Sequence, residues 1–262
     1  MQFRIKTHLV YSAARPSDVL LQIEALHDDE QLCLKGGVDA VTAAGSNVVS
    51  GDEGLGLRRW VHVERQFECT YDAIVDVVRG GVALDRCAQT ALASIPGDVT
   101  KFLMPSRYCY PEDFFEFCAT QFGALSGGAL IAAMSNWIKT HFTYDIGASD
   151  AKTTATQSFA ARAGVCRDYA HVLIAMARAV GVPARFVSVY APDVSPQDFH
   201  AVAEVYLGGR WHLVDPTGMA QAPEIVRIGV GRDAADVSFM TSYGELMLIK
   251  QTVEVSRVAP SS

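Results

Sequence analysis

The chain has 262 residues, half of them apolar, and a formal net charge of -7 at pH 7. This is ample for a packed core in one large domain or two smaller ones. The scattered lysines and arginines form no basic stripe that would follow a phosphate backbone, so we expect neither nucleic acid nor anionic lipid as a partner.

The start of the chain shows no export pattern. Residues 1–16 lack an uninterrupted apolar stretch followed by a small-residue cleavage site. The longest apolar run, 172–180, is too short to span a bilayer and contains Arg178. We therefore expect a soluble, cytoplasmic protein without a membrane partner.

Alternating apolar and polar residues dominate the first hundred positions. The pattern is clear at 3–9, 19–25 and 58–71, and it is typical of half-buried strands. The Gly- and Asp-containing segment 43–56 is predicted as a break between strands. This part of the chain predicts a β-sandwich-like domain.

The pattern changes near residues 102–114, where Pro105 and Pro111 bracket a predicted linker. We place the boundary there, with an N-terminal β-rich domain at 1–104 and a second domain at 105–262. Pro111 is well placed in the first turn of a helix that would run to about residue 121.

Helical periods follow at 127–141, 153–163 and 166–180. Gly181 is a suitable cap for the third helix, and Pro183 follows as a stop signal. Both faces of this helix are mostly apolar, so it should be nearly buried.

Strand patterns then appear at 185–190, 200–207, 210–214 and about 246–258. Helices followed by an antiparallel sheet are the α+β pattern. The predicted fold class is therefore α+β.

The chain has six cysteines, and a disulfide framework is not expected in a chain of this kind, so we predict reduced thiols. There is no Cys-x-x-Cys pair and no pair of histidines with zinc-site spacing, so we expect no metal and no cofactor. Four cysteines are interpreted as inert core residues, namely Cys33, Cys69, Cys87 and Cys118, and Cys109 in the linker is interpreted similarly but with greater exposure.

Cys166 stands apart because it begins the third helix. A helix N-terminus favours the thiolate, and its free backbone N–H groups could donate to an oxyanion. The alternative is one more buried, inert thiol. The presence of a suitable base decides between the two.

A hairpin supplies the candidate base. With Gly208 and Gly209 as its two-residue turn, Val202 pairs with Asp215. His200 lies on the same face as Val202, which makes Asp215 its diagonal neighbour, with roughly 7 Å between β-carbons. The carboxylate can therefore reach the imidazole.

Such a pair could fix the tautomer of the histidine while its other ring nitrogen faces a thiol. The alternatives are a structural hydrogen bond, or an aspartate that merely opens the Asp-Pro-Thr-Gly turn at Asp215. His212 should face away from His200, and His171 is interpreted as a packed or capping residue.

The ordered segments 164–190 and 200–218 resemble the transglutaminase-like superfamily of papain-like cysteine enzymes, in the bacterial type with an added N-terminal β domain. Segments 103–109 and 230–245 also take part in this resemblance, so nearly the whole chain is covered.

The resemblance implies a catalytic triad of Cys166, His200 and Asp215, with the cysteine at the head of a helix packed on an antiparallel sheet. It implies acyl transfer through a thioester, to water or to an amine. One position departs from the family, which commonly has Trp where this chain has Val202. No acidic cluster suggests a calcium requirement.

We therefore hypothesise a cysteine protease or amidase that acts on peptide or protein substrates. Transamidation to an amine is the nearest alternative. A non-catalytic protein-binding module is the alternative from another class. The sequence leaves the oligomeric state open.

Overall fold

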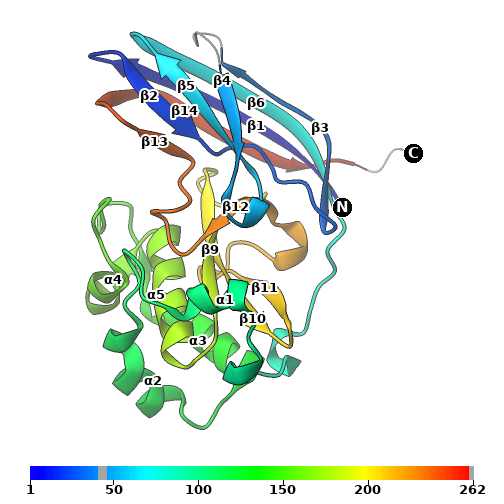
Figure 1. The fold of residues 1–262 in the computed structure, drawn as a ribbon, viewed down its shortest axis with the longest axis vertical. Coiled ribbons are helices and arrows are strands. Elements are labelled where there is room, and N and C mark those ends of the chain that lie inside the picture. Colours follow the sequence, from blue (N-terminus) through cyan, green and yellow to red (C-terminus); the bar gives the residue numbers. More distant parts are fainter. Residues whose placement is uncertain (41–45, 260–262) are drawn as a thin grey trace.

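The computed structural model describes residues 1–40 and 46–259. Figure 1 shows two bodies, a pair of β-sheets at one end of the molecule and a core of helices around a third sheet at the other. The predicted α+β class and the β-rich first domain are confirmed.

The β domain consists of two antiparallel sheets whose inner faces share one apolar cluster. The alternation of apolar and polar residues explains why one face of each sheet is buried against the other sheet. In the first strand, for example, Phe3, Ile5 and Leu9 are all fully buried. The first sheet has the order β14 (Leu246–Arg257), β1 (Gln2–Ala13), β6 (Gln66–Val77) and β3 (Gln31–Ala40). The second has the order β13 (Met240–Ser242), β2 (Ser17–Leu21), β5 (Leu57–Val63) and β4 (Ser46–Ser50).

Two details of this domain differ from the sequence prediction. The alternating run 58–71 forms parts of two strands, β5 and β6, separated at residues 64–65. The predicted break at 43–56 contains β4, and residues 41–45 lie outside the described part. Strand β4 is fully exposed, which explains why no apolar alternation marks it.

The predicted domain boundary needs correction at both ends. The part of the β domain that comes first in the chain ends with β6 at Val77, well before residue 104. Near the other end of the chain, β14 pairs with β1 from Phe3↔Arg257 to Ala13↔Leu246, and β13 pairs with β2. These last strands belong to the β domain because Val253 and Val255 are buried in its cluster.

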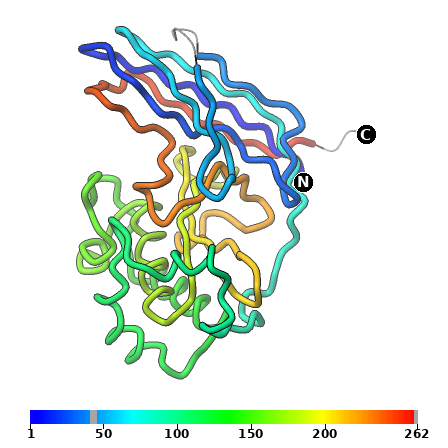
Figure 2. The backbone as a smooth tube through the Cα atoms, in the orientation of Figure 1, coloured from blue at the N-terminus to red at the C-terminus, as the bar shows by residue number. Residues whose placement is uncertain are grey.

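The segment after β6 runs along the outside of the molecule to the far end of the core, as Figure 2 shows. It is held there by backbone pairing, because Gly208 N–H donates to the Ala88 carbonyl at 2.9 Å and Gln89 forms a bridge with Leu207. Short helical turns shape the segment, at Leu84–Arg86, Leu92–Ser94, α1 (Gly97–Thr100) and Lys101–Leu103.

Four further helices build the core. The α3 bounds agree with the predicted 127–141, and α5 is buried at every position from Asp168 to Arg178, as expected. The prediction for Cys109 was wrong, because this residue is fully buried against the core helices. The helices are α2 (Phe115–Phe122, preceded by a 3-10 turn at Pro111–Phe114), α3 (Gly127–His141), α4 (Ala155–Ala161) and α5 (Cys166–Ala179).

Within the described ranges, no single helix is long and apolar enough to cross a membrane. Two adjacent helical segments, Pro111–Phe122 and Gly127–His141, are together long and apolar enough, but the chain bends by 101° between them.

The core sheet is antiparallel, and α5 packs on one of its faces. Ala201, Ala203 and Val205 of β10 join the helix cluster, whereas Val187 and Val202 join a smaller cluster on the opposite face. The strand order is β11 (Arg210–Val214), β10 (His200–Leu207), β9 (Ala184–Tyr190) and β12 (Val226–Gly231), and a separate parallel pair joins β7 (Thr143–Tyr144) to β8 (Ala163–Gly164).

Buried charges connect the core sheet to the β domain. Glu204 of β10 accepts from Arg185 at 2.7 Å and from Arg227 at 3.2 Å. Arg227 also donates to Asp28 at 2.5 Å and to Glu30 at 3.1 Å, both from the β domain. A carboxylate that is 2% exposed therefore holds two guanidinium groups, one of which reaches the other domain.

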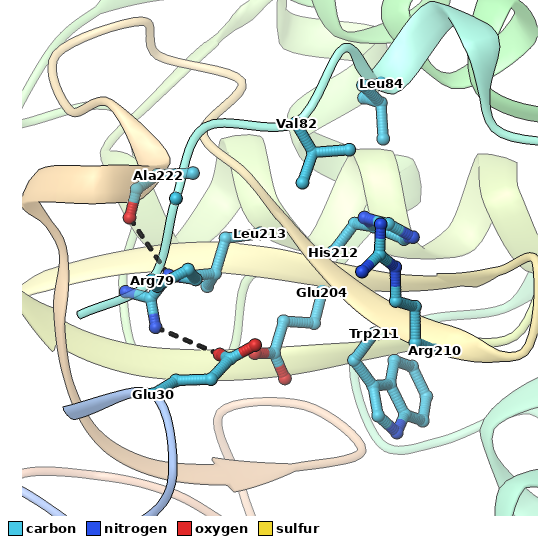
Figure 3. A pocket seen from close by; sticks show the side chains of 11 residues that line it. Glu30, Arg79, Val82, Leu84, Glu204, Arg210, Trp211, His212, Leu213 and Ala222 are labelled. Atoms are coloured by element: carbon cyan, nitrogen blue, oxygen red, sulfur yellow. Dashed lines mark hydrogen bonds and ion pairs between the residues drawn. The ribbon is translucent and has the colours of Figure 1, made fainter. Parts of the chain in front are cut away.

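Figure 3 shows the small cavity beside this network, with a volume of about 60 Å³. Arg79 lies between the Ala222 carbonyl and the Glu30 carboxylate, at 3.1 and 3.2 Å, and Glu204 lies next to Glu30. Since the basic and acidic groups there already pair with one another, the arrangement stabilises the contact between the domains.

Candidate active site

Cys166 is the first residue of α5, as the sequence predicted. The turn before it is fixed by Asp168, whose Oδ2 accepts from the Val165 N–H at 2.8 Å and from Ser149 Oγ at 2.5 Å. Gly164 has φ +155, and a β-carbon there would lie 2.6 Å from Asp168. Glycine is therefore required for the close approach that positions the cysteine.

Tyr144 is a site residue that sequence reasoning missed. It pairs with Gly164 across the two-residue strands β7 and β8, and its side chain lies close enough to Cys166 for the thiol to affect its pKa. Burial and the neighbouring thiol raise the pKa of Tyr144 well above its usual range. The hydroxyl is therefore protonated at neutral pH and lies beside the sulfur.

The hairpin register is confirmed. Gly208 and Gly209 form the turn with positive φ, and the strands pair from Leu207↔Arg210 to Ala203↔Val214. The next positions along the same register are Val202 and Asp215. His200 Nε2 lies 3.0 Å from Asp215 Oδ2, and both side chains are almost fully buried.

The Asp215 carboxylate also organises the following turn. Its Oδ1 accepts from the Thr217 N–H at 2.9 Å and from Thr217 Oγ1 at 2.7 Å, and its Oδ2 accepts from the Ala220 N–H at 2.8 Å. Burial raises the pKa of Asp215, but the hydrogen bonds from His200 and Thr217 outweigh it and lower the pKa. The same carboxylate therefore holds both the turn at residues 215–220 and the His200 ring.

The other ring nitrogen of His200, Nδ1, is buried and has no hydrogen-bond partner among the described residues. Cys166 lines the same cavity and is close enough to affect the pKa of the ring. Burial lowers the pKa of His200, but the interactions with Asp215 and Cys166 dominate and raise it to about 10. The structure thus brings all three predicted residues together around a charged imidazole.

Cys166 and His200 open into a cavity of about 310 Å³. Aromatic side chains line part of it, and the rings of Phe199 and Phe239 stack with centroids 4.4 Å apart. Polar groups come from Arg167, Asp198, Ser188, Ser238 and Gln251. A mostly apolar cleft with a few polar groups is typical of a substrate site.

The β domain supplies part of this cavity. Gln251 belongs to β14, and its Nε2 donates to Asp198 Oδ1 at 2.7 Å. Asp198 precedes His200 by two residues. The cavity therefore lies between the two bodies of the molecule and is lined by both.

The two other core histidines have structural surroundings. His171 stacks on Tyr108 with ring centroids 5.0 Å apart, and its Nε2 accepts from the Ala234 N–H. Burial lowers the pKa of His171 to about 3, so it is neutral. His212 contacts the Leu207 carbonyl and does not line the cavity.

The remaining thiols differ from Cys166 in environment. Burial raises the pKa of Cys69, Cys109 and Cys118 to about 12, which keeps them protonated. Cys33 and Cys87 are half-buried, less deeply than the sequence predicted. Over residues 1–40 and 46–259, no group of three or more His, Cys, Asp or Glu residues is arranged to hold a metal ion.

Val202, where the family commonly has Trp, is fully buried in the cluster on the sheet face away from α5. It does not line the cavity. Trp211 packs instead against Phe102, with ring centroids 5.2 Å apart, and against the Arg185 guanidinium. Neither residue lines the cavity, although Val202 lies opposite Asp215 in the hairpin register.

Comparison with known proteins finds similarity in both sequence and fold. Residues 119–216, which include Cys166, His200 and Asp215, match the model of the Transglutaminase-like superfamily. A crystal structure described as that of "a Putative Cysteine Protease from Cytophaga hutchinsonii" superposes with a TM-score of 0.93 at 28% sequence identity, covering 100% of this chain and 92% of that one.

Curated relatives occur in mycobacteria. An uncharacterized protein of Mycobacterium tuberculosis (strain H37Rv) is 32% identical over 200 residues, which is 66% of this chain and 63% of the relative. An uncharacterized protein of Mycobacterium leprae is 29% identical over 118 residues, which is 41% of this chain and 42% of the relative. The chain thus spans only part of the length of these relatives.

Proposed function

Because this chain is a member of the transglutaminase-like superfamily, we propose that it is a cysteine-dependent acyl-transfer enzyme that cleaves amide bonds of peptides or proteins. The observation that carries the proposal is the geometry of His200. One ring nitrogen is held by Asp215 at 3.0 Å, the other is buried without a partner among the described residues, and Cys166 at the start of a helix affects the pKa of the ring.

In the first half of the reaction, the Cys166 thiolate attacks the amide carbonyl carbon and forms a carbon–sulfur bond. The carbonyl oxygen becomes an oxyanion, to which the protonated Tyr144 hydroxyl would donate. The carbon–nitrogen bond then breaks, and the amine leaves with the proton from His200 Nδ1. A thioester remains on Cys166.

In the second half, neutral His200 takes a proton from water, and the resulting hydroxide attacks the thioester carbon. Collapse of this intermediate releases a carboxylic acid, and the proton on His200 restores the starting ion pair. Asp215 keeps Nδ1 directed at the sulfur throughout and stabilises the imidazolium.

Transamidation is the second candidate, since an amine could take the place of water. Asp198 favours it to a degree, because this exposed carboxylate lies on the cavity wall two residues from His200 and would attract a protonated amine. The acyl-enzyme is common to both reactions. The two differ only in the acceptor.

Mass spectrometry of the intact protein tests the proposal. After brief incubation with an acyl-donor peptide library, we expect one thioester adduct, located on Cys166 by peptide mapping and absent from Cys166→Ala. Added cadaverine would be converted to a peptide amide if amines are acceptors. Peptide binding with no adduct on any cysteine would contradict an enzyme and favour a binding module.

A further inference from the structure

One carboxylate on the wall of the active-site cavity has no countercharge. The charged side chains that line the cavity are Arg167, Asp198 and His200. His200 is paired with Asp215 at 3.0 Å, and Arg167 lies 3.4 Å from the buried carboxylate of Asp168. Asp198, by contrast, accepts hydrogen bonds only from neutral donors among the described residues. The cavity therefore carries one unpaired negative charge.

The Asp198 carboxylate is held in one orientation. Its Oδ1 accepts from the Phe199 N–H and from Gln251 Nε2, both at 2.7 Å. Gln251 Oε1 in turn accepts from the Tyr11 hydroxyl at 3.2 Å. Tyr11 and Gln251 belong to the paired strands β1 and β14, so the β domain fixes this side chain (Figure 1). Within residues 1–40 and 46–259, Oδ2 has no hydrogen-bond partner, and since Asp198 is exposed, a bound molecule can reach it.

Asp198 lies close to the reacting groups. It precedes His200 by two residues, so their Cα atoms are at most about 7 Å apart. Its charge also acts on Tyr144, because burial is the main cause of the raised pKa of that hydroxyl, and the Cys166 thiol and Asp198 add to it. A group bound at Asp198 would therefore lie beside the amide that Cys166 attacks.

An aromatic wall adjoins this carboxylate. Phe199 follows Asp198 directly, and its ring stacks on that of Phe239 with centroids 4.4 Å apart. Both rings line the cavity and are half-buried. Apolar rings beside a single unpaired carboxylate match a side chain that has an apolar stem and a cationic end, as lysine and arginine have.

We propose that Asp198 is a specificity-determining residue, which selects a substrate with a lysine or arginine side chain next to the scissile amide. The ammonium or guanidinium group would pair with Asp198 Oδ2, and the methylene stem would pack on Phe199 and Phe239. Tyr11 and Gln251 are positioning residues, because they act through Asp198. The inference rests on the acyl-transfer reaction proposed above and names the substrate class of the same site.

An acceptor amine is the other source of a positive charge in this reaction. Asp198 would attract such an amine, but a carboxylate also favours the protonated form, which cannot attack a thioester. A lysine or arginine side chain of the acyl donor keeps its charge throughout, so its pairing with Asp198 does not oppose the reaction. The side chain of the donor is therefore the favoured occupant.

Active-site-directed probes test the preference without turnover. Three tripeptidyl acyloxymethyl ketones differ only in the residue before the reactive group, which is lysine, norleucine or glutamate, and each alkylates a nucleophilic thiol. Labelling rates are measured on the full-length protein by intact mass, and peptide mapping locates the adduct. An ion pair at an exposed site strengthens binding by up to about fivefold, so we expect the lysine probe to react about fivefold faster than the norleucine probe. The glutamate probe should react slowest.

Substitutions assign the preference to Asp198. In Asp198→Asn, the lysine and norleucine probes should react at equal rates, through a loss of the lysine rate alone, and in Asp198→Lys the glutamate probe should become the fastest. Asp193→Asn is the matched control and should keep the lysine preference, because this exposed aspartate lies in the same loop but does not line the cavity. Iodoacetamide should label Cys166 equally in wild type and both asparagine variants.

Equal rates of the lysine and norleucine probes on wild type, an unchanged preference in Asp198→Asn, or no labelling by any peptide probe would each overturn the inference. It would also fall if Asp198→Asn changed only the yield of cadaverine amide from the acyl-enzyme, since Asp198 would then serve the acceptor.

The proposed reaction is judged separately from the preference. A lysine preference at Cys166 without any thioester from acyl-donor peptides would support the role of Asp198 and remove the enzyme. Thioesters that form equally fast from lysine and norleucine peptides would keep the enzyme and remove that role.

Discussion

At the residue scale, the site depends on how the hydrogen bonds to Asp215 are divided between its two carboxylate oxygens. Oδ2 accepts from His200 and Ala220, and Oδ1 accepts twice from Thr217. An orienting carboxylate and a turn-forming aspartate are usually considered as alternatives. Here one side chain makes both sets of contacts, because the strand ends one residue before it.

Asp215→Asn separates the two roles. The amide can keep its oxygen toward Thr217, but its NH₂ group then meets the N–H groups of His200 and Ala220. We expect a folded protein in which iodoacetamide labels Cys166 more slowly and kcat falls by roughly 10³- to 10⁴-fold. Asp98→Asn, at an exposed carboxylate, is the control. Full activity of Asp215→Asn would reduce the site to a cysteine and a histidine.

The raised pKa of His200 predicts how stability depends on pH. Its pKa is about 10 in the folded protein and has the ordinary value of 6.5 in the unfolded chain, so the folded protein binds one more proton between these values. The stabilisation is complete below pH 6.5 and is lost as the pH rises to about 10. In urea unfolding, the free energy of unfolding of wild type should therefore fall more steeply from pH 7 to 10 than that of His200→Ala. Equal slopes would contradict the pKa.

Tyr144→Phe tests the hydroxyl beside the nucleophile. Removing one oxyanion donor should lower kcat for amide cleavage by about 10²-fold or more, while alkylation of Cys166 by iodoacetamide is unchanged because it forms no oxyanion. Tyr110→Phe, at a residue that is 38% exposed, is the control. Loss of alkylation together with turnover would instead indicate that Tyr144 only supports the fold of β7 and β8.

At the element scale, the start of α5 depends on a glycine that leaves room for Asp168. We expect Gly164→Ala to push Asp168 away from the Val165 N–H, to displace Cys166 and to reduce acylation at least tenfold. Gly208→Ala is the matched control, since Gly208 also has positive φ but open space around it. It should cost about 1 kcal/mol of stability and leave the rate per folded molecule unchanged. Rates are compared at equal folded fraction, measured by circular dichroism.

Local patterns explain which elements the sequence predicted well. The two glycines at 208 and 209 fixed the hairpin register, and with it the pair of His200 and Asp215, while the helical period placed Cys166 at a helix start. Tyr144 escaped prediction because a two-residue parallel strand has no periodicity. Strand β12 (Val226–Gly231) was also missed, since two of its six residues are glycines, which weaken a strand pattern.

At the scale of the whole molecule, the interface between the β domain and the core depends on Glu204. Glu204→Gln would leave Arg185 and Arg227 buried without their shared negative charge, and should lower the free energy of unfolding by about 3 kcal/mol. Asp72→Asn, which removes an exposed pair with Arg4, should change it very little. Urea titration of both variants measures the difference. Equal effects would show that the buried network adds nothing to the joint.

The division into domains could not be predicted from the sequence. The pairing of Phe3 with Arg257 joins residues at opposite ends of the chain, and no local pattern states which of several sheets a strand will join. The alternation of 246–258 correctly predicted a strand. Only its partner was unknown.

The position of β14 has a consequence for biosynthesis. The ribosome makes the whole core, including Cys166 and His200, before it makes Gln251, the β-domain residue on the cavity wall. Until β14 emerges, β1 lacks the neighbour that the finished sheet gives it, and the cavity lacks one wall. A nascent chain that has not yet reached β14 can therefore hold a folded α5 with Cys166 at its start and still lack the Gln251 side of the cavity.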